Sequence, residues 1–524
     1  MTAIRRIYVY LLAFAGLWML AGGAANLGRV VLELLASAAA TANTGYVREE
    51  VSRWGAAALV GLPVWLLHWW WAQRAAQGDP SEVVSALRRL YLYAVLAVAV
   101  LAGASALHEA MQAALETRPP SASLPPLATA TVALLVWVYH WPVARQVAEH
   151  GGTLRRWYVY GSAFVGYLLL LNGARLIIER SWELAVGSSA SSGAPMGLLA
   201  GGIADALVGL GVWLLHWVVL RPVHPGEERA TLRSVYLFLT LAVAVAGTLG
   251  GLSEALYYAL GRALGIERPG GVGGSLLQAA AGPVSIVVVH GCAWLYTRAA
   301  LRQHALETPR QAGVRRLYTY LVALISLLML VVGVAGLLWV VADALTSAPG
   351  TAGADWWRDR VAAFVTLTVV GLPVWLLHWR PTAATTSDEL TAFSRRLYVY
   401  LTLIAASLTL LGSAALAAYR LLTLVLGARP EPSLSSELAH DLANALVAGV
   451  VIGYHWQALR GPAAAVAGEP SREEAVAAEP SRYEAVATEP AGYEAVLRVR
   501  APDAQALEAA LQRLREAGLD VDAV

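Results

Sequence analysis

Long apolar segments alternate with short polar segments along the first 460 residues. Six of the apolar segments are nearly free of charged residues, and they cover 8–25, 90–106, 158–171, 235–252, 317–341 and 397–418. A segment of about 20 apolar residues spans the hydrocarbon core of a bilayer as an α-helix. A helix satisfies its own backbone hydrogen bonds, which lipid cannot do. The pattern therefore predicts an all-α integral membrane fold.

Two short signatures recur around these segments. The first is Arg-Arg-x-Tyr-x-Tyr, with copies that begin at Arg5, Arg88, Arg155, Arg233, Arg315 and Arg395. The second is Val-Trp-Leu-Leu-His-Trp, which occurs unchanged at 64–69, 212–217 and 374–379 and in looser form around His140, His290 and His455. Each copy of the second signature ends another apolar segment. The chain is thus one two-helix unit written six times, which predicts about 12 transmembrane helices.

The order of the repeats predicts a higher level of organisation. Because each unit crosses the membrane twice, all six enter it in the same sense, as parallel repeats. Residues 61–69 match 371–379 closely, whereas repeats two, four and six carry the looser His signature. We therefore expect three four-helix membrane units, at 1–150, 151–305 and 306–460. Either a ring or an open row of these units fits the pattern.

The character of the chain changes after residue 460. Residues 461–492 are rich in Ala, Glu and Pro and contain a ten-residue repeat that starts at Glu469, Glu479 and Glu489. This composition is typical of an extended linker. In 493–524, alternating residues at 495–500 indicate a strand, and Leu507, Leu511 and Leu514 share one face of a helix. We expect a small cytoplasmic βαβ-like segment that pairs with a protein partner or with a second copy of the chain, or that stays partly disordered.

Composition supports a membrane protein. Hydrophobic residues make up 58% of the chain and charged residues only 14%, against about 25% charged in average globular domains. The net charge of +2 gives no reason to expect a nucleic-acid partner. Cys292 is the single cysteine, so an internal disulfide and a multi-cysteine metal site are excluded.

Arginine placement predicts the orientation. The termini and linkers on the side of the His signature carry 20 arginines, and the opposite helix ends and loops carry 12. The richer side is expected to be cytoplasmic, so both termini of the membrane part lie in the cytoplasm of a multi-pass protein of the cell (plasma) membrane. The Arg-Arg pairs are expected anchors at the membrane surface, and they are also possible binding sites for anionic lipid.

The repeated histidines and their tryptophans are the candidate motif residues: His68, His140, His216, His290, His378, His455, Trp65, Trp213 and Trp375. Aromatic side chains at this depth are typical of the belt at a membrane interface. An aromatic belt does not explain why a histidine occurs in all six copies, and three interpretations of this histidine stay open. It is a structural imidazole bonded to a neighbouring Tyr or carbonyl, a pH-responsive group, or a haem ligand.

Ionisable groups within the apolar segments are the second set of candidates, because such groups often mark function in membranes. Arg175, Asp205 and Glu254 are the main ones. Structural ion pairs and a solute pathway both remain possible. We find no catalytic motif, metal-ligand set or cofactor signature and expect no enzyme activity. A non-enzymatic scaffold, sensor or assembly factor is the leading function; a transporter or channel for a small solute is the alternative, and a haem-binding redox protein a remote one.

The paired signatures resemble those of an uncharacterised bacterial family of multi-pass membrane proteins that is known only as a domain of unknown function. The resemblance covers residues 1–460 in repeated copies. It implies a membrane location and repeated helical hairpins, and it brings no activity or site. Repeat four departs from the pattern at Ser234, Phe238, Val287 and Gly291, so any role of the aromatic pair around the histidine is in doubt there.

Overall fold

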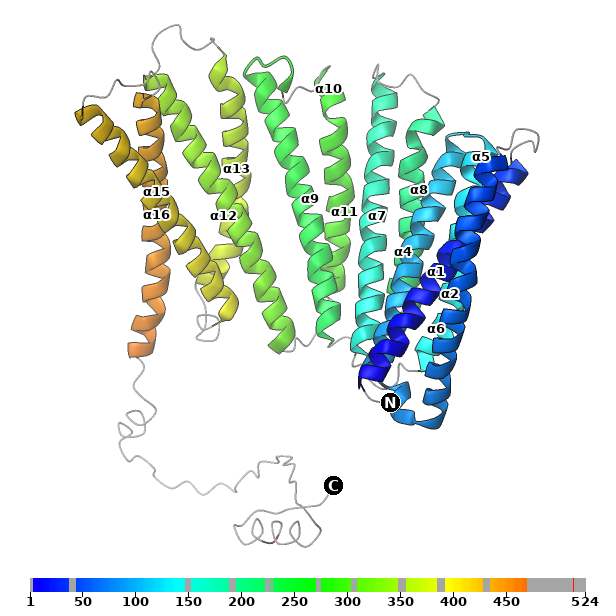
Figure 1. Cartoon of the computed structure of the whole chain (residues 1–524). Coiled ribbons are helices and arrows are strands. Elements are labelled where there is room, and N and C mark those ends of the chain that lie inside the picture. The colour runs from blue at the N-terminus through cyan, green and yellow to red at the C-terminus, as the bar shows by residue number, and fades with distance from the viewer. Residues whose placement is uncertain are drawn as a thin grey trace, which may run out of the picture. The chain divides into compact units, whose positions relative to one another are not determined.

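The structure is a computed structural model of the whole chain (Figure 1). It describes residues 3–36, 44–146, 152–187, 195–221, 227, 230–269, 275–302, 309–346, 355–383, 392–426, 434–468 and 512. Regular secondary structure in these ranges is entirely helical. The predicted all-α class is therefore confirmed for the part of the chain that the structure describes.

Each repeat consists of two long helices. The first helices are α1 (Ala3–Ala36), α4 (Ala86–Leu115), α7 (Thr153–Val186), α9 (Thr231–Ala263), α12 (Pro309–Thr346) and α15 (Phe393–Val425). The second helices are α2 (Thr44–Gly78), α6 (Pro125–Gln146), α8 (Pro195–Trp213) with its π-helical continuation η3 (Leu214–Val219), α11 (Ala281–Arg302), α13 (Trp356–Ala383) and α16 (Leu434–Gly468). Three short helices, α3 (Pro80–Val83), α5 (Pro120–Ser123) and α10 (Leu276–Ala279), precede α4, α6 and α11.

Several helices are longer than the apolar pattern predicts. Helix α2 begins at Thr44, so the polar stretch before its apolar segment is also helical. Ion pairs of Arg53 with Glu49 and Glu50, at 2.6 and 3.0 Å, stabilise this polar part of the helix. Helix α16 continues to Gly468, into the segment whose composition predicts a linker. The rest of the predicted linker, and the predicted βαβ segment apart from the helical residue Gln512, lie outside the described residues.

Eleven helices in the described ranges are long and apolar enough to cross a membrane. Helix α16 is a twelfth long helix and is not among these eleven; Glu437, His440 and Asp441 lie in its first two turns. Of the roughly 12 predicted helices, 11 are thus long and apolar enough to span a membrane, and the twelfth is a long helix with a more polar start.

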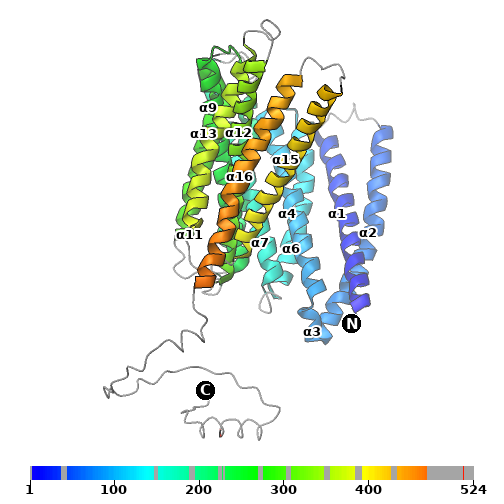
Figure 2. The same cartoon turned by 90° about the vertical axis from the view of Figure 1, so that its left-hand side faces the viewer.

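The repeats pack in chain order. Residues 1–463 form one compact unit. Within it, the first helix of each repeat contacts the first helix of the next, from α1 to α4 and on through α7, α9, α12 and α15. Figures 1 and 2 show this succession of helices from two sides. The first helix also contacts the second helix of the next repeat, as in α1 with α6 and α4 with α8. Each repeat is therefore held by its neighbours along the chain.

The hairpins of repeats one, three and five depend on close backbone approach. Gly61, Gly209 and Gly371 each lie seven residues before the motif histidine. A Cβ atom on Gly209 would lie 2.4 Å from the backbone nitrogen of Leu170, and one on Gly61 would lie 2.5 Å from that of Leu20. Small residues at such contacts let membrane helices pack closely. These glycines thus set the spacing of the two helices.

We expect Gly209→Ala to destabilise the protein by about 1–3 kcal/mol, because the added methyl group has to displace the backbone of α7. Thermal unfolding of the purified protein in detergent would show this as a lower melting temperature. Gly211→Ala is the matched control, since a Cβ atom there meets nothing within 4 Å. Equal melting temperatures for the two variants would contradict the close-approach argument.

Candidate functional site: the repeated aromatic and histidine motif

The six motif histidines share one hydrogen bond. In each, Nδ1 lies 2.7–3.0 Å from the carbonyl oxygen of the residue four positions earlier in the same helix. A carbonyl oxygen only accepts, so Nδ1 carries the proton and donates it. The assignment of this tautomer leaves Nε2 of each neutral imidazole as an acceptor. The ring is thereby held in one orientation and offers a single lone pair to a neighbour.

In four repeats, the hydroxyl of the first tyrosine of the same repeat donates a hydrogen bond to Nε2. The Tyr hydroxyl and the His Nε2 are 2.9 Å apart in Tyr158–His216 and 3.0 Å apart in Tyr398–His455. The distance is 3.4 Å in Tyr91–His140 and 3.5 Å in Tyr8–His68. The two signatures of one repeat are therefore joined, since the tyrosine lies on the first helix and the histidine on the second.

A tryptophan of the preceding repeat completes the arrangement. The indole N–H three residues before the histidine donates to the tyrosine of the next repeat: Trp65 to Tyr91 at 3.3 Å, Trp137 to Tyr158 at 2.7 Å, Trp213 to Tyr236 at 3.0 Å and Trp375 to Tyr398 at 3.0 Å. We call this series, from indole to hydroxyl to imidazole to carbonyl, the Trp–Tyr–His chain. It is complete at His140, His216 and His455. Each member strengthens the next by polarisation.

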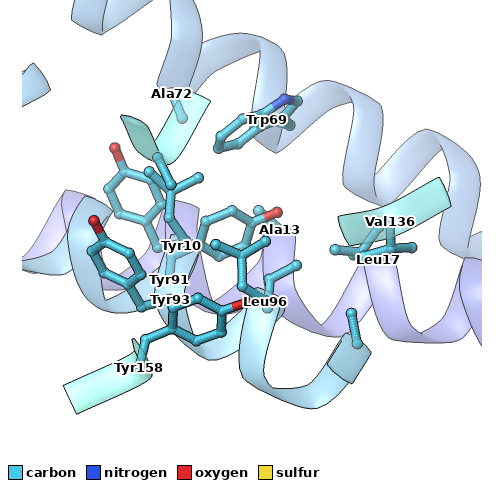
Figure 3. Close-up of a cluster of buried hydrophobic side chains, with 14 of the residues drawn as sticks. Tyr10, Ala13, Leu17, Trp69, Ala72, Tyr91, Tyr93, Leu96, Val136 and Tyr158 are labelled. Carbon is cyan, nitrogen blue, oxygen red and sulfur yellow. The ribbon is translucent and has the colours of Figure 1, made fainter. Parts of the chain in front are cut away.

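A second set of contacts, the aromatic ladder, runs beside the Trp–Tyr–His chains. The last aromatic residue of each Arg-Arg-x-Tyr-x-Tyr signature packs on the first tyrosine of the next repeat, with ring centroids 5.5–5.8 Å apart. The pairs are Tyr10–Tyr91, Tyr93–Tyr158, Tyr160–Tyr236, Phe238–Tyr318 and Tyr320–Tyr398. Figure 3 shows the first four of these tyrosines in one buried cluster with Trp69. All five junctions between repeats carry such a pair.

The tryptophan after the histidine links second helices. Trp69 donates to the hydroxyl of Tyr139 at 2.7 Å, Trp217 to that of Tyr296 at 2.9 Å, and Trp379 to that of Tyr454 at 2.9 Å. These bonds join repeat one to two, three to four, and five to six. The same repeats are paired in the predicted units 1–150, 151–305 and 306–460, whose boundaries stay a prediction.

Two arginines at the motif end pair with buried glutamates. Arg6 binds Glu82 through two contacts of 2.9 Å, and Glu82 is only 1% exposed. Arg156 binds Glu227 at 2.9 Å, and Tyr160 donates to the same carboxylate at 2.7 Å. These acids were not among the residues predicted from sequence. Their shared position, six residues before Arg88 and Arg233, is the signal that could have found them. Glu389 has the same spacing from Arg395 and lies outside the described residues.

Repeat four breaks the Trp–Tyr–His chain, as its sequence indicates. Val287 stands where the indole is expected and has no proton to donate to Tyr318. Within the described ranges, the Tyr318 hydroxyl makes no hydrogen bond, although its ring keeps the ladder contact with Phe238. His290 packs against Gly247, where a Cβ atom would lie 2.1 Å from its ring.

The geometry bears directly on the haem interpretation. Both ring nitrogens of His68, His140, His216 and His455 face a protein partner. Iron would have to displace the tyrosine hydroxyl from Nε2 in each of them. The arrangement therefore favours the structural interpretation of the imidazoles.

The three intramembrane candidates fall into two sets of contacts. Asp205 lies 2.8 Å from Nδ1 of His108 and accepts from Asn172 at 2.7 Å, which joins α8 to α4 and α7. Arg175 forms an ion pair with Glu179 one turn along α7.

Glu254 on α9 accepts from Tyr258 at 3.1 Å. A Cβ atom on Gly282 of α11 would lie 4.0 Å from both the Glu179 and the Glu254 carboxylates. Arg175 and Glu254 thus share one polar cluster, and Asp205 belongs to another.

A third polar cluster was not predicted. Asp343 on α12 binds Arg360 at 3.0 Å and lies 2.7 Å from Nε2 of His440. An apolar cavity of about 150 Å³ lies nearby between α12, α15 and α16, with Thr402 and Asn444 among its lining residues. None of Arg175, Asp205 and Glu254 lines it.

Comparison with known protein families identifies the family of this chain. One family model, a domain of unknown function (DUF5671), matches three stretches, at 6–119, 170–292 and 316–472. The chain belongs to the DUF5671 family. The three matches confirm the resemblance and the repeated organisation that the signatures predict. No curated protein and no solved structure matches the chain. Membership in the DUF5671 family therefore brings no activity, and the contacts described above have to support any function.

We expect Tyr158→Phe to destabilise the protein by about 1–3 kcal/mol, because it leaves the Trp137 indole N–H and Nε2 of the fully buried His216 without a partner. Chemical or thermal denaturation in detergent would measure the loss. Tyr8→Phe is the matched control, because Tyr8 occupies the same signature position but is 52% exposed and lies 3.5 Å from His68. Similar losses in both variants would show that the complete chain adds nothing.

Proposed function

We propose that this DUF5671 protein is a multi-pass protein of the plasma membrane whose repeats form a non-enzymatic scaffold. The Trp–Tyr–His chain is the observation that carries the proposal. Its polar atoms bond to one another across repeats, so the most repeated side chains of the sequence are used to fix helices in register. The scaffold would hold the C-terminal segment beside the membrane, where it meets a cytoplasmic partner or a second copy.

The physics of membrane helices supports this role for the chain. Lipid tails are as apolar as leucine, so helices associate through close packing and interhelical hydrogen bonds. Each such bond contributes on the order of 0.6–2 kcal/mol. The contacts recur at successive junctions, and together they favour one arrangement of the repeats over alternatives.

The intramembrane ionisable groups fit a scaffold better than a solute path. Asp205 contacts α4 and α7, and Arg175 pairs with Glu179 on its own helix. Arg175 is thus offset by a carboxylate, and Asp205 has polar partners inside the protein, as expected of structural groups. A transporter needs such groups to face a common cavity, and the two sets of contacts give no support to that alternative.

The proposed orientation in the membrane is based on the distribution of arginines between the two ends of the helices. The side of the His signature carries 20 of them against 12 on the other side, which supports cytoplasmic termini under the positive-inside rule. The Arg-Arg pairs then lie at the level of the anionic headgroups. The linker after Gly468 would let the C-terminal segment move away from the surface.

Topology can be tested with single cysteines in a Cys292→Ala background. We expect Gly78→Cys and Gly152→Cys to react with a membrane-impermeant maleimide only after the cytoplasmic side is opened, since both lie at the motif end. Ser121→Cys and Glu267→Cys, which are exposed at the opposite end, should react in intact cells. Labelling of Gly78→Cys and Ser121→Cys from the same side would contradict the proposed topology.

The division into scaffold and tail can be tested by truncation. We expect deletion of 493–524 to leave membrane insertion and the melting temperature unchanged, because the repeat contacts all lie before residue 463. Self-association in nanodiscs, followed by mass photometry, should be lost if a second copy is the partner. Deletion of 469–488 is the control, since it shortens the linker and keeps the terminal segment. A truncated chain that no longer inserts or melts cooperatively would contradict the proposal.

A further inference from the structure

We propose that the motif end of repeats one and two holds a binding site for a phosphate-bearing anion, with Arg88 at its base. The inference rests on the proposed placement of this end at a membrane surface. It does not depend on the scaffold role or on the C-terminal partner. The site is a polar cavity of about 390 Å³ lined by Gln73, Ala76, Gln77, Val83, Arg88 and Gln146.

The charge of Arg88 is the first argument. Its side chain is buried, with the residue only 4% exposed. The guanidinium donates to the carbonyl of Ala72 at 3.4 Å and to the side-chain oxygen of Gln73 at 2.5 Å, and it lies 5.4 Å from the ring of Trp69. These partners are all neutral. No carboxylate in the described part of the chain lies within 4.0 Å of this guanidinium.

Arg155, which holds the place of Arg88 in repeat three, likewise donates to a backbone carbonyl, so the cavity and its amide lining are what distinguish Arg88. The second arginines of two other pairs are neutralised. Arg6 and Arg156 occupy the same end of the helices and are each paired with a buried glutamate. A buried cation without an anion is expensive unless something offsets its charge. The Tyr10 hydroxyl beside Arg88 is neutral as well. Arg88 therefore brings to the cavity a buried charge that no carboxylate in the described ranges offsets.

The cavity itself fits such a ligand. Gln73, Gln77 and Gln146 come from α2 and α6 and bring amide groups whose N–H bonds can donate to oxygen. Arg88 lies in the first turn of α4, where the helix dipole favours negative charge. Guanidinium and amide donors together match a tetrahedral phosphate better than a carboxylate, because they approach it from several directions.

The sequence restricts this site to the first two repeats. The positions equivalent to Gln73, five residues after the histidine, hold Arg221 in repeat three and Ala383 in repeat five. The position of Gln146, six residues after the histidine, holds Tyr296 in repeat four. The amide lining is thus a local addition to the repeat and is not required by its packing.

Two sources can supply the phosphate: an anionic lipid headgroup or a free phosphate compound. Basic pockets between membrane helices are known to suit phospholipid headgroups. We would place the full chain in nanodiscs of phosphatidylcholine alone and of phosphatidylcholine mixed with phosphatidylglycerol. Inorganic phosphate would be titrated into the first, and lipid retention would be measured by native mass spectrometry in the second. Incorporation into the nanodisc reports the membrane placement separately.

We expect Arg88→Gln to weaken binding about tenfold or more, because it removes a charge-assisted hydrogen bond. Arg89→Gln is the matched control, since it removes the neighbouring charge of the same pair and lies outside the cavity lining; it should change binding by less than about twofold. Gln146→Glu alters an exposed residue and places a carboxylate in the cavity, so it should abolish binding even if Arg88→Gln fails to fold.

Retention of phosphatidylglycerol without a phosphate response would identify a lipid headgroup as the ligand, and the reverse would identify a free phosphate compound. If Arg88→Gln and Arg89→Gln lose the same amount of binding, general surface charge would explain the binding, and the proposed site would be wrong. Binding of neither probe by the wild-type chain would also overturn it. So would unchanged binding in Gln146→Glu.

Discussion

The hydroxyl of the first signature tyrosine is the atom on which the membrane part depends. It accepts a hydrogen bond from an indole of the preceding repeat and donates one to an imidazole of its own repeat. One small group thus satisfies two buried nitrogens on two different helices. An unpaired buried donor or acceptor is costly, so these hydrogen bonds hold three helices together at the tyrosine hydroxyl. The backbone carbonyl that holds Nδ1 fixes the imidazole, so the whole arrangement has a single direction from indole to carbonyl.

Much of this architecture could be predicted from the sequence. The long apolar runs and the two recurring signatures indicate repeated helical hairpins, and the family matches agree with them. The pairing of Tyr158 with His216 was one of the open interpretations of the histidine. The sequence alone could not decide it, because an aromatic belt and a bonded imidazole require the same residues at the same depth.

Other features depend on three-dimensional contacts that periodicity does not encode. Glu82 looks like an ordinary linker residue, and only its bond to Arg6, 76 positions earlier, makes it structural. The partition of Arg175 and Asp205 into separate clusters follows from which helices meet, which the repeat pattern leaves open. Helix ends were also misplaced, since apolar runs mark the membrane core and α2 extends beyond it through the ion pairs of Arg53.

The missing indole at Val287 has a mechanical consequence. A stack in which each repeat touches only its neighbours behaves as a one-dimensional chain of links, and such a chain parts at its weakest link. The junction between repeats two and three has both the indole bond of Trp137 and a ring pair. The junction between repeats four and five lacks the indole bond and keeps the ring pair of Phe238 and Tyr318, together with a hydrogen bond from Tyr257 to Asp359 near the other end of the helices. The ladder tyrosines at the other four junctions each accept an indole hydrogen bond, so Tyr318 resists lateral tension through ring contact where they also use a directional bond.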